Sequence, residues 1–287
     1  MTKAATKTGT DPTALVAIEQ YFPETERIID DNLADQILPS GRGFLWMMHL
    51  NSVRNWMVRI TEKNFPGLWS CMMCRKRYID EELIDSVNKI GAVVNLGAGF
   101  DTRAYRLKEL SDIPVWELDQ PKNIEAKKIQ LGKVFETIPS HVKLVPIDFD
   151  HQDINTKLKS HGYLADKRTF FIWEGVTQYL TEEGIRSTFD FFSKAAPGSR
   201  LVFTYVRKDF IQGQSKYGWD KIYEKYVINK IWIFGMEPVE WPNFLKKYGW
   251  RVIEDIGYDE MAEKYVVPTG RKLASTQVER MIYTEKL

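Results

Sequence analysis

A glycine-rich turn near residue 98 is the part of the sequence best suited to hold a ligand. The apolar run 92–96 leads into Gly97-Ala98-Gly99, and a helical pattern follows. Glycines at such a strand-to-helix turn allow positive φ and close approach of a ligand, and the start of a helix offers free N–H groups. A pyrophosphate-binding fingerprint would need a third glycine, but position 102 is threonine (Thr102). The turn therefore favours a ligand without phosphates.

Acidic residues follow the later apolar runs at positions that suit the rest of an adenosyl ligand. Asp119 lies 119 − 99 = 20 residues beyond Gly99, the separation at which an acid meets the ribose hydroxyls in dinucleotide-binding folds. Asp148 can accept from an adenine amine, and the adjacent Phe149 can pack on the base. Glu174 follows the next apolar run. All these residues come at the carboxyl ends of expected strands, where open α/β sheets bind their ligands.

The elements that position these residues alternate between strands and helices. Seven short apolar runs have the character of strands: 92–96, 114–118, 143–147, 169–173, 200–205, 250–257 and 278–285. Helical patterns separate the first five of them, at 102–110, 121–133, 153–160 and 182–195. This alternation predicts an α/β fold of Rossmann-like type, with a mostly parallel seven-stranded sheet and helices on both faces.

The chain divides into parts that differ in their residue patterns. We expect a flexible tail at 1–12, an N-terminal helical cap at 13–90 and the ligand-binding core at 91–287. Within the cap, 13–21 is helical, 44–62 predicts a helix buried on more than one side because it is rich in Trp, Met and Leu, and 81–89 predicts a further helix. The aromatic-rich segment 207–248 interrupts the alternation and predicts an inserted helical lid.

Composition excludes several classes of function. The 287 residues carry a net charge of only +1, which gives no electrostatic footprint for nucleic acid. No secretory signal is visible, and the apolar stretch 44–50 is too short to span a bilayer, so we expect a cytoplasmic protein without a membrane partner. Cys71 and Cys74 have the spacing of half a zinc site, but no second pair accompanies them, so we expect buried thiols and no metal. The oligomeric state is not readable.

Five sequence blocks together resemble a known enzyme family. They are RKRYID (75–80), VVNLGAGFDTRAYRL (93–107), WELDQP (116–121), PIDFD (146–150) and WEGVTQYL (173–180). The chain is similar in these blocks to the leucine carboxyl methyltransferase-like family, which includes protein phosphatase methyltransferases and polyketide O-methyltransferases of the tetracenomycin type. The resemblance spans about 75–205, and the long block 93–107 makes it specific. It implies a class I methyltransferase fold with S-adenosyl-L-methionine (SAM) as the cofactor.

The resemblance also implies roles for the matching residues. Arg75 or Arg77 would pair with the methionyl carboxylate of SAM, since a guanidinium fits a carboxylate with two bonds. The other implied contacts follow the chain: Gly97, Ala98 and Gly99 at the methionyl chain, Asp119 at the ribose, Asp148 and Phe149 at the adenine, Glu174 at the methionyl ammonium, and Tyr179 on the substrate side near the methyl group.

The expected reaction is methyl transfer to an oxygen of a small molecule by in-line displacement. A carboxylate is ionised at neutral pH and needs no general base, whereas a hydroxyl would need one, for which His151 or Tyr179 is the candidate. Three alternatives stay open: carboxyl methylation of a protein C-terminus, a nicotinamide-dependent Rossmann oxidoreductase, and a SAM-binding protein without catalysis.

Overall fold

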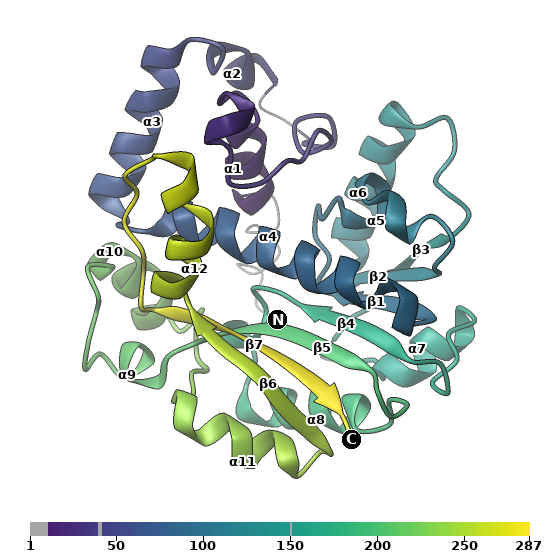
Figure 1. Ribbon diagram of the computed structural model, residues 1–287. Helices are drawn as coiled ribbons and strands as arrows, with labels where there is room; N and C mark the ends of the chain where they lie inside the picture. Colours follow the sequence, from purple (N-terminus) through teal and green to yellow (C-terminus); the bar gives the residue numbers. More distant parts are fainter. Residues whose placement is uncertain (1–10, 40–41, 150) are drawn as a thin grey trace.

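A single mixed sheet organises the computed structural model, which describes residues 11–39, 42–149 and 151–287 (Figure 1). Its strands are β1 (Ala92–Leu96), β2 (Val115–Asp119), β3 (Val142–Pro146), β4 (Thr169–Trp173), β5 (Arg200–Val206), β6 (Trp250–Gly257) and β7 (Glu279–Lys286). They lie in the order β3-β2-β1-β4-β5-β7-β6, with β1 to β5 parallel and β7 antiparallel to both β5 and β6. The prediction of a mostly parallel, seven-stranded Rossmann-like sheet is confirmed.

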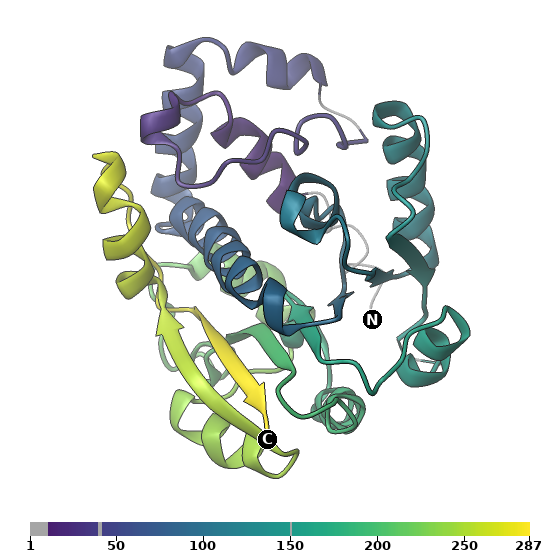
Figure 2. The same ribbon diagram turned by 45° about the vertical axis from the view of Figure 1, so that its right-hand side comes forward.

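Helices cover both faces of the sheet because successive strand residues point to opposite sides. Val93 and Phe170 share one core with helices α4 (Leu68–Ser86) and α12 (Tyr258–Tyr265). Their neighbours Val94 and Phe171 share the other core with α8 (Glu182–Phe192) and α11 (Trp241–Lys246). Figures 1 and 2 show the two pairs of helices on opposite sides of the strands.

The remaining elements are helices, of which α3 and α6 are the longest, at 14 residues each. They are α1 (Asp11–Glu19), η2 (Glu24–Glu26), α2 (Arg42–Met47), α3 (Asn51–Asn64), η3 (Val87–Lys89), α5 (Arg103–Arg106), η4 (Lys108–Leu110), α6 (Pro121–Val134), α7 (Ile154–Ser160), η5 (Thr177–Tyr179), α9 (Lys208–Ile211), α10 (Asp220–Ile222), the π-helix η6 (Tyr223–Ile228), η7 (Pro238–Glu240) and η8 (Val267–Thr269). Most of the tail expected at 1–12 lies outside the described residues, and its last two residues begin α1.

The N-terminal helices differ from the expectation in two places. The predicted helix 44–62 is two helices, α2 and α3, and it is not buried on more than one side: Arg54 is the buried residue of α3, whereas Trp46 and Trp56 are exposed. Arg54 faces inward because its guanidinium stacks 4.4 Å from the centroid of the Phe22 ring and donates to the Met48 carbonyl.

The predicted helix 81–89 is the end of a much longer one. Helix α4 starts at Leu68, directly after Gly67, whose φ of 77° separates it from α3. Asp80 therefore lies inside α4, where its carboxylate is buried. Helix α12 was not predicted at all, and it packs along α4.

The inserted segment 207–248 falls into two parts. Its first part builds a small core in which Phe210, Trp219 and Trp232 pack with Leu68 of α4 and Tyr179. Its second part, which includes Trp241 of α11, packs against the sheet and does not cover the site. Only the first part therefore has the position expected of a lid.

Candidate functional site

The main cavity opens at the carboxyl ends of the strands, where the sheet order turns from β1 to β4. Its volume is about 240 Å³. Such a reversal leaves a crevice between the two loops that leave neighbouring strands in opposite directions. The wall on the sheet side comes from the glycine turn after β1, Asp119 of β2, and Glu174 after β4. The opposite wall comes from α4 and the inserted segment, so the cavity is enclosed by the core and the cap together.

The glycine turn has a geometry that side chains would obstruct. Gly97 and Gly99 have φ values of 74° and 46°, which L-residues rarely adopt. A Cβ on Gly97 would lie only 2.5 Å from Cγ2 of Val176. The N–H groups of Gly97 and Ala98 both donate to the Leu118 carbonyl, at 2.8 and 3.0 Å. The turn is thus fixed against the end of β2, and it lines the cavity as predicted.

Asp119 sits at the end of β2 with its carboxylate almost fully buried. One oxygen accepts from the Gly99 N–H at 2.6 Å, and the other accepts from the Gln120 N–H at 2.7 Å and from Nδ2 of Asn123 at 2.8 Å. Burial raises the pKa of Asp119, while these donors oppose the shift. A carboxylate has about four acceptor positions, so this one retains capacity for a ligand hydroxyl.

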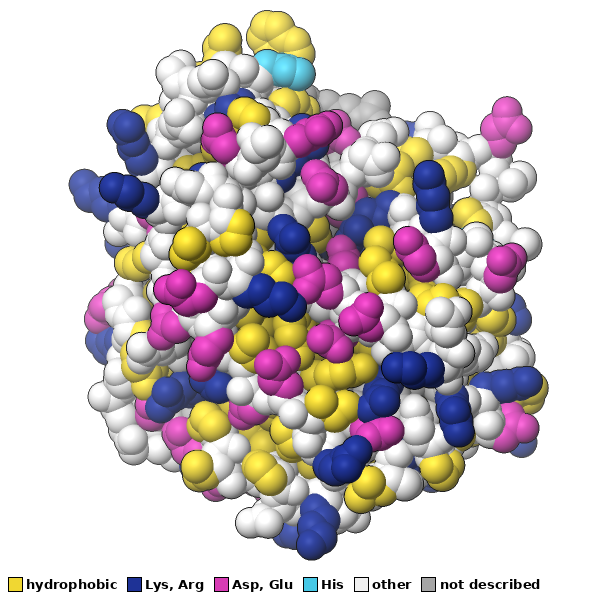
Figure 3. All heavy atoms as spheres, viewed as in Figure 1, with side chains coloured by type: hydrophobic (Ala, Val, Ile, Leu, Met, Phe, Trp, Pro, Cys, Tyr) yellow, Lys and Arg dark blue, Asp and Glu magenta, His cyan; other side chains and the backbone are white. Residues whose placement is uncertain are grey.

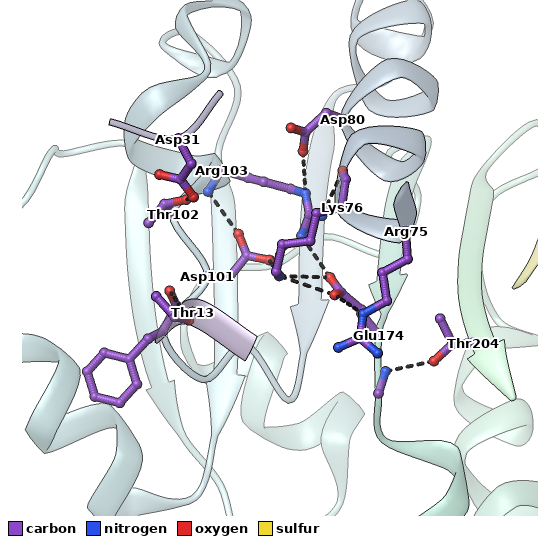
Figure 4. A network of polar contacts seen from close by, with 12 residues as sticks. Thr13, Asp31, Arg75, Lys76, Asp80, Asp101, Thr102, Arg103, Glu174 and Thr204 are labelled. Atoms are coloured by element: carbon purple, nitrogen blue, oxygen red, sulfur yellow. Dashed lines mark hydrogen bonds and ion pairs between the residues drawn. The ribbon is translucent and has the colours of Figure 1, made fainter. Parts of the chain in front are cut away.

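Glu174 lies at the centre of a buried ion network on the other side of the turn (Figure 4). Its carboxylate accepts from Nε of Arg75 at 2.8 Å and from Nη1 of Arg103 at 3.0 Å, and Nζ of Lys76 lies 3.2 Å away. Burial alone would raise the pKa of Glu174, but Lys76, Arg103 and Arg75 outweigh it and hold the pKa well below its usual range. Glu174 is therefore ionised, and its carboxylate is already paired with three cationic side chains.

Arg75 extends this network to β7, the strand between β5 and β6. Its Nη1 donates to Oε1 of Glu279, on β7, at 3.1 Å. Tyr258 donates to the same oxygen at 2.6 Å. Arg75, Glu174 and Glu279 all line the cavity, so its polar wall presents charges of both signs.

Arg103 carries the network in the other direction, toward the cap. Its Nε donates to Asp80 of α4 at 2.6 Å, and its Nη1 also contacts Asp101. Arg106 pairs with Asp80 as well and lies 3.5 Å from Asp31. These residues have almost no exposed surface, so α4 is tied to the β1 loop by ion pairs shielded from water.

The end of the cavity away from the ion network is aromatic. Tyr226 stacks on Trp232, with ring centroids 5.1 Å apart and planes at 25°. Tyr179 meets the same indole edge-on at 6.3 Å. Trp219 is fixed by its Nε1, which donates to the Pro66 carbonyl at 2.7 Å. These rings line the cavity, and this end suits an apolar or aromatic molecule.

Four of the predicted site residues do not line this cavity. Arg77 points away from it, donating to Glu81 and to the Ile28 carbonyl. Asp148 and His151 pair with each other at 3.0 Å on the surface, and the His151 side chain is 79% exposed. Phe149 lines a separate hollow, which meets the main cavity at Val176 and Tyr179. The other predicted residues, Arg75, Gly97, Ala98, Gly99, Asp119, Glu174 and Tyr179, line the main cavity together.

Sequence reasoning missed three charged residues of the site. Lys76 lies within the matched block RKRYID, between the two arginines Arg75 and Arg77, and it lines the cavity. Asp101 follows Gly99 by two residues, and this position beside the glycine turn was the signal that could have identified it. Glu279 lies at the start of the last strand, 279 − 75 = 204 residues after its partner Arg75, and no local pattern links the two.

Comparison with known proteins decides the family. The sequence profile described as leucine carboxyl methyltransferase matches residues 10–193, more than half of the chain. The chain belongs to the leucine carboxyl methyltransferase family. The matched segment of this family member contains the glycine turn, Asp119, Glu174 and α4.

Several relatives of this family member have provisional names of the same kind. YktD of Bacillus subtilis, provisionally named an S-adenosyl-L-methionine-dependent methyltransferase, is 39% identical over 115 residues, which are 39% of this chain and 38% of YktD. A protein of Mycobacterium avium with the same kind of name is 33% identical over 137 residues, 47% of this chain and 46% of that protein. The chain therefore matches less than half the length of these relatives.

Solved structures support the fold of this family member. A DUF574 family protein from Streptomyces avermitilis superposes with a TM-score of 0.58 at 12% identity, covering 82% of this chain and 90% of its own. A protein from Thermobifida fusca, provisionally described as a methyltransferase, gives a TM-score of 0.58 at 14% identity, covering 81% and 88%. At such identities the likeness concerns the fold alone.

Proposed function

We propose that this member of the leucine carboxyl methyltransferase family is a SAM-dependent O-methyltransferase that acts on a small, largely apolar molecule carrying a carboxylate. One observation carries the proposal. A single cavity joins a polar wall, made by the glycine turn, Asp119 and the Arg75–Glu174 pair, to an aromatic end made by the inserted segment. The first suits the cofactor and the second suits the acceptor.

The residues of the polar wall fit SAM in shape and in charge. The turn at Gly97 and Gly99 leaves no room for a side chain beside Val176, which fits a backbone that packs closely on a ligand. Asp119 would hold the ribose hydroxyls, as the sequence spacing suggested. The methionyl group of SAM carries both an ammonium and a carboxylate, and this wall presents both carboxylates and cations, among them Arg75 and Lys76.

The two predicted contacts to the methionyl group differ in their support. We assign the carboxylate to Arg75 and not to Arg77, because Arg75 lines the cavity and Arg77 faces away from it. Glu174 was expected at the ammonium, but its carboxylate is already surrounded by three cations. We therefore propose that Glu174 chiefly holds Arg75 in position.

When bound, SAM supplies a methyl group that its sulfonium already activates for displacement. This methyl group would pass to an acceptor oxygen by in-line displacement, with the sulfur as the leaving group. The protein has to align the oxygen and exclude water, and alignment of this kind contributes about 7–11 kcal/mol. Tyr179, Trp219 and Trp232 would hold the acceptor's apolar part and shield the reacting atoms.

The composition of the cavity wall favours a carboxylate over a hydroxyl. Among the described residues that line it, none is a histidine, and His151 lies on the surface. A carboxylate needs no base, whereas an alcohol must lose a proton as it reacts. Tyr179 stays the candidate base for a phenolic acceptor.

The proposal is tested by offering the purified protein SAM with a panel of carboxylic acids, phenols and peptides with a free C-terminus. We expect release of S-adenosylhomocysteine with an aromatic or aliphatic carboxylic acid, and a product whose methyl group mild alkaline hydrolysis removes as methanol. An alkali-stable product would indicate an ether, and turnover only with peptides would favour the protein C-terminus. SAM binding without turnover throughout the panel would support the non-catalytic alternative.

The alternative of a nicotinamide-dependent oxidoreductase has lost its support, because the matching family profile is that of a methyltransferase.

A further inference from the structure

A group of large apolar side chains is exposed on the N-terminal helices, outside the cavity. We call it the cap patch: Phe44, Trp46, Met47, Leu50, Trp56 and Ile60. Trp46 is 71% exposed and Trp56 57% exposed, although tryptophan is normally among the more deeply buried residues. Figure 3 shows hydrophobic side chains protruding at the top of the molecule, over α2. Large apolar side chains gathered and exposed on one segment in this way are typical of an interaction site.

The exposed charged side chains within the helical segment 44–63 itself have one sign. The outward face of α3 carries Trp56, Ile60, Arg59 and Lys63 at helical spacing. The acid of this segment, Glu62, points inward and accepts from the backbone of Gly67 and Ala274. Among the described side chains of 44–63, the exposed charged groups are therefore basic.

We propose that the cap patch docks the protein on the surface of an anionic lipid bilayer. Aromatic and aliphatic side chains flanked by arginine and lysine are the composition with which amphipathic helices enter the headgroup region, where the apolar groups are buried and the cations meet anionic lipids. Among the helices that the structure describes, none has the length and apolar character needed to cross a membrane. The proposal revises the expectation from the sequence that no membrane takes part.

A second copy of the chain is the main competing occupant, and the geometry disfavours it. A two-fold dimer would place the same patch of both copies in one interface, so that two sets of Arg59 and Lys63 would gather there with no exposed acid of segment 44–63 to pair with them. The patch also protrudes, whereas a stable protein interface buries about 800 Å² on each partner over a closely matched surface. A lipid surface accommodates a protruding patch and supplies the missing negative charge.

The position of the patch connects it with the proposed acceptor site. Helix α3 leads through a short turn into α4, whose Leu68 and Met72 line the cavity. Docking through α2 and α3 would therefore hold the protein on a lipid bilayer, into which apolar acceptor molecules also partition. The docking itself does not depend on the proposed methyl transfer.

Co-sedimentation with vesicles tests this inference. We expect the full chain to sediment with vesicles of phosphatidylcholine and phosphatidylglycerol, more weakly with phosphatidylcholine alone, and less at high salt. The double variant Trp46→Ser/Trp56→Ser should reduce partitioning at least about tenfold. Arg59→Glu/Lys63→Glu should abolish the preference for phosphatidylglycerol.

A matched control uses exposed apolar residues elsewhere on the surface. Leu164→Ser/Val239→Ser removes two such side chains, Val239 being 82% exposed, and should leave partitioning unchanged. Circular dichroism and SAM binding check that every variant is folded. The proposal is wrong if the unaltered chain stays in the supernatant with both vesicles, or if the control loses as much binding as the tryptophan variant. It is equally wrong if light scattering shows a dimer that the tryptophan variant dissociates.

Discussion

Arg75 of α4 and Glu174 after β4 form a 2.8 Å ion pair in which both side chains are almost fully buried. The pair joins the N-terminal helices to the sheet at the cavity wall. Burying two charges is costly, and the cost is recovered only when each charge is fully paired. Here Glu279 and Lys76 complete the pairing, so the N-terminal helices and the sheet are coupled through the site itself.

Removing the Arg75 guanidinium should therefore destabilise the fold strongly. We expect Arg75→Met to lower the free energy of unfolding by about 3–5 kcal/mol, because the buried Glu279 loses its ion-pair partner and Glu174 loses one of its three cations. Arg77→Met is the matched control, and the surface pair it breaks is worth about 0–1 kcal/mol. Urea denaturation measures both. Equal losses would contradict a special role for Arg75.

A methyl group on Gly97 should disrupt the glycine turn. The new Cβ would meet Val176 at 2.5 Å, and the positive φ adds about 1–2 kcal/mol of strain. We expect Gly97→Ala to lose calorimetrically detectable SAM binding. Combining it with Val176→Ala removes the clash but not the strain, so the double variant should recover part of the affinity. No recovery would mean that the clash is not the cause.

Asp119 should matter to SAM binding far more than Asp148. Loss of hydrogen bonds to a charged group costs about 1.5–3 kcal/mol, or roughly ten- to hundredfold in Kd, so Asp119→Ala should weaken SAM by that factor. Asp148→Ala should change Kd less than about twofold, because its carboxylate lies outside the main cavity. A large effect of Asp148→Ala would restore the adenine contact expected from the sequence.

The ion network should give stability a defined dependence on acid. Burial would raise the pKa of Asp101, but Arg103 and Lys76 lower it to about 2 from an ordinary 3.8. A lowered folded-state pKa stabilises the protein fully above the ordinary value, and the contribution disappears as pH falls through the folded value. For Asp101 this is about 2 kcal/mol lost between roughly pH 4 and pH 2.

The test compares unfolding free energies across that range. We expect Asp101→Asn to reduce the slope of stability against pH, whereas Glu182→Gln, which removes an exposed acid of α8, should not. Glu174 acts in the same direction, so some acid dependence should survive in the Asp101 variant. A slope identical to that of the unaltered chain would show that Asp101 does not carry it.

A carboxylate acceptor predicts a reaction without a general base. His151→Ala should keep kcat within about twofold, since loss of a true base costs about 10²–10⁴. Tyr179→Phe keeps the ring against Trp232 and should cost less than about tenfold, with kcat independent of pH near neutrality. A loss of more than a hundredfold in either variant would point to a hydroxyl acceptor.

The sheet could be predicted from sequence because its signal is local. Each of the seven strands is a short apolar run, and every predicted run lies within one residue or two of the observed strand. The glycine turn and Asp119 were likewise found from spacing along the chain. Helix α12 was not predicted from the sequence. It is positioned by contacts with α4, about 180 residues earlier in the chain.

The polar site was less predictable because distant residues complete it. Apolar content suggested that 44–62 is buried, but burial depends on which face meets the core, and Arg54 occupies that face. The pairing of Arg75 with Glu279 depends on how β7 enters the sheet. Composition identifies such residues as charged and says nothing about their partners.

The place of β7 has a consequence for synthesis of the chain. Because β7 lies between β5 and β6 and hydrogen-bonds to both, β6 cannot join the sheet until the ribosome has released the segment that follows it. The same segment delivers Glu279 to Arg75, so the nascent chain holds an incompletely neutralised arginine until β7 has been synthesised. Chaperones and proteases would therefore encounter an open form until β7 takes its place between β5 and β6.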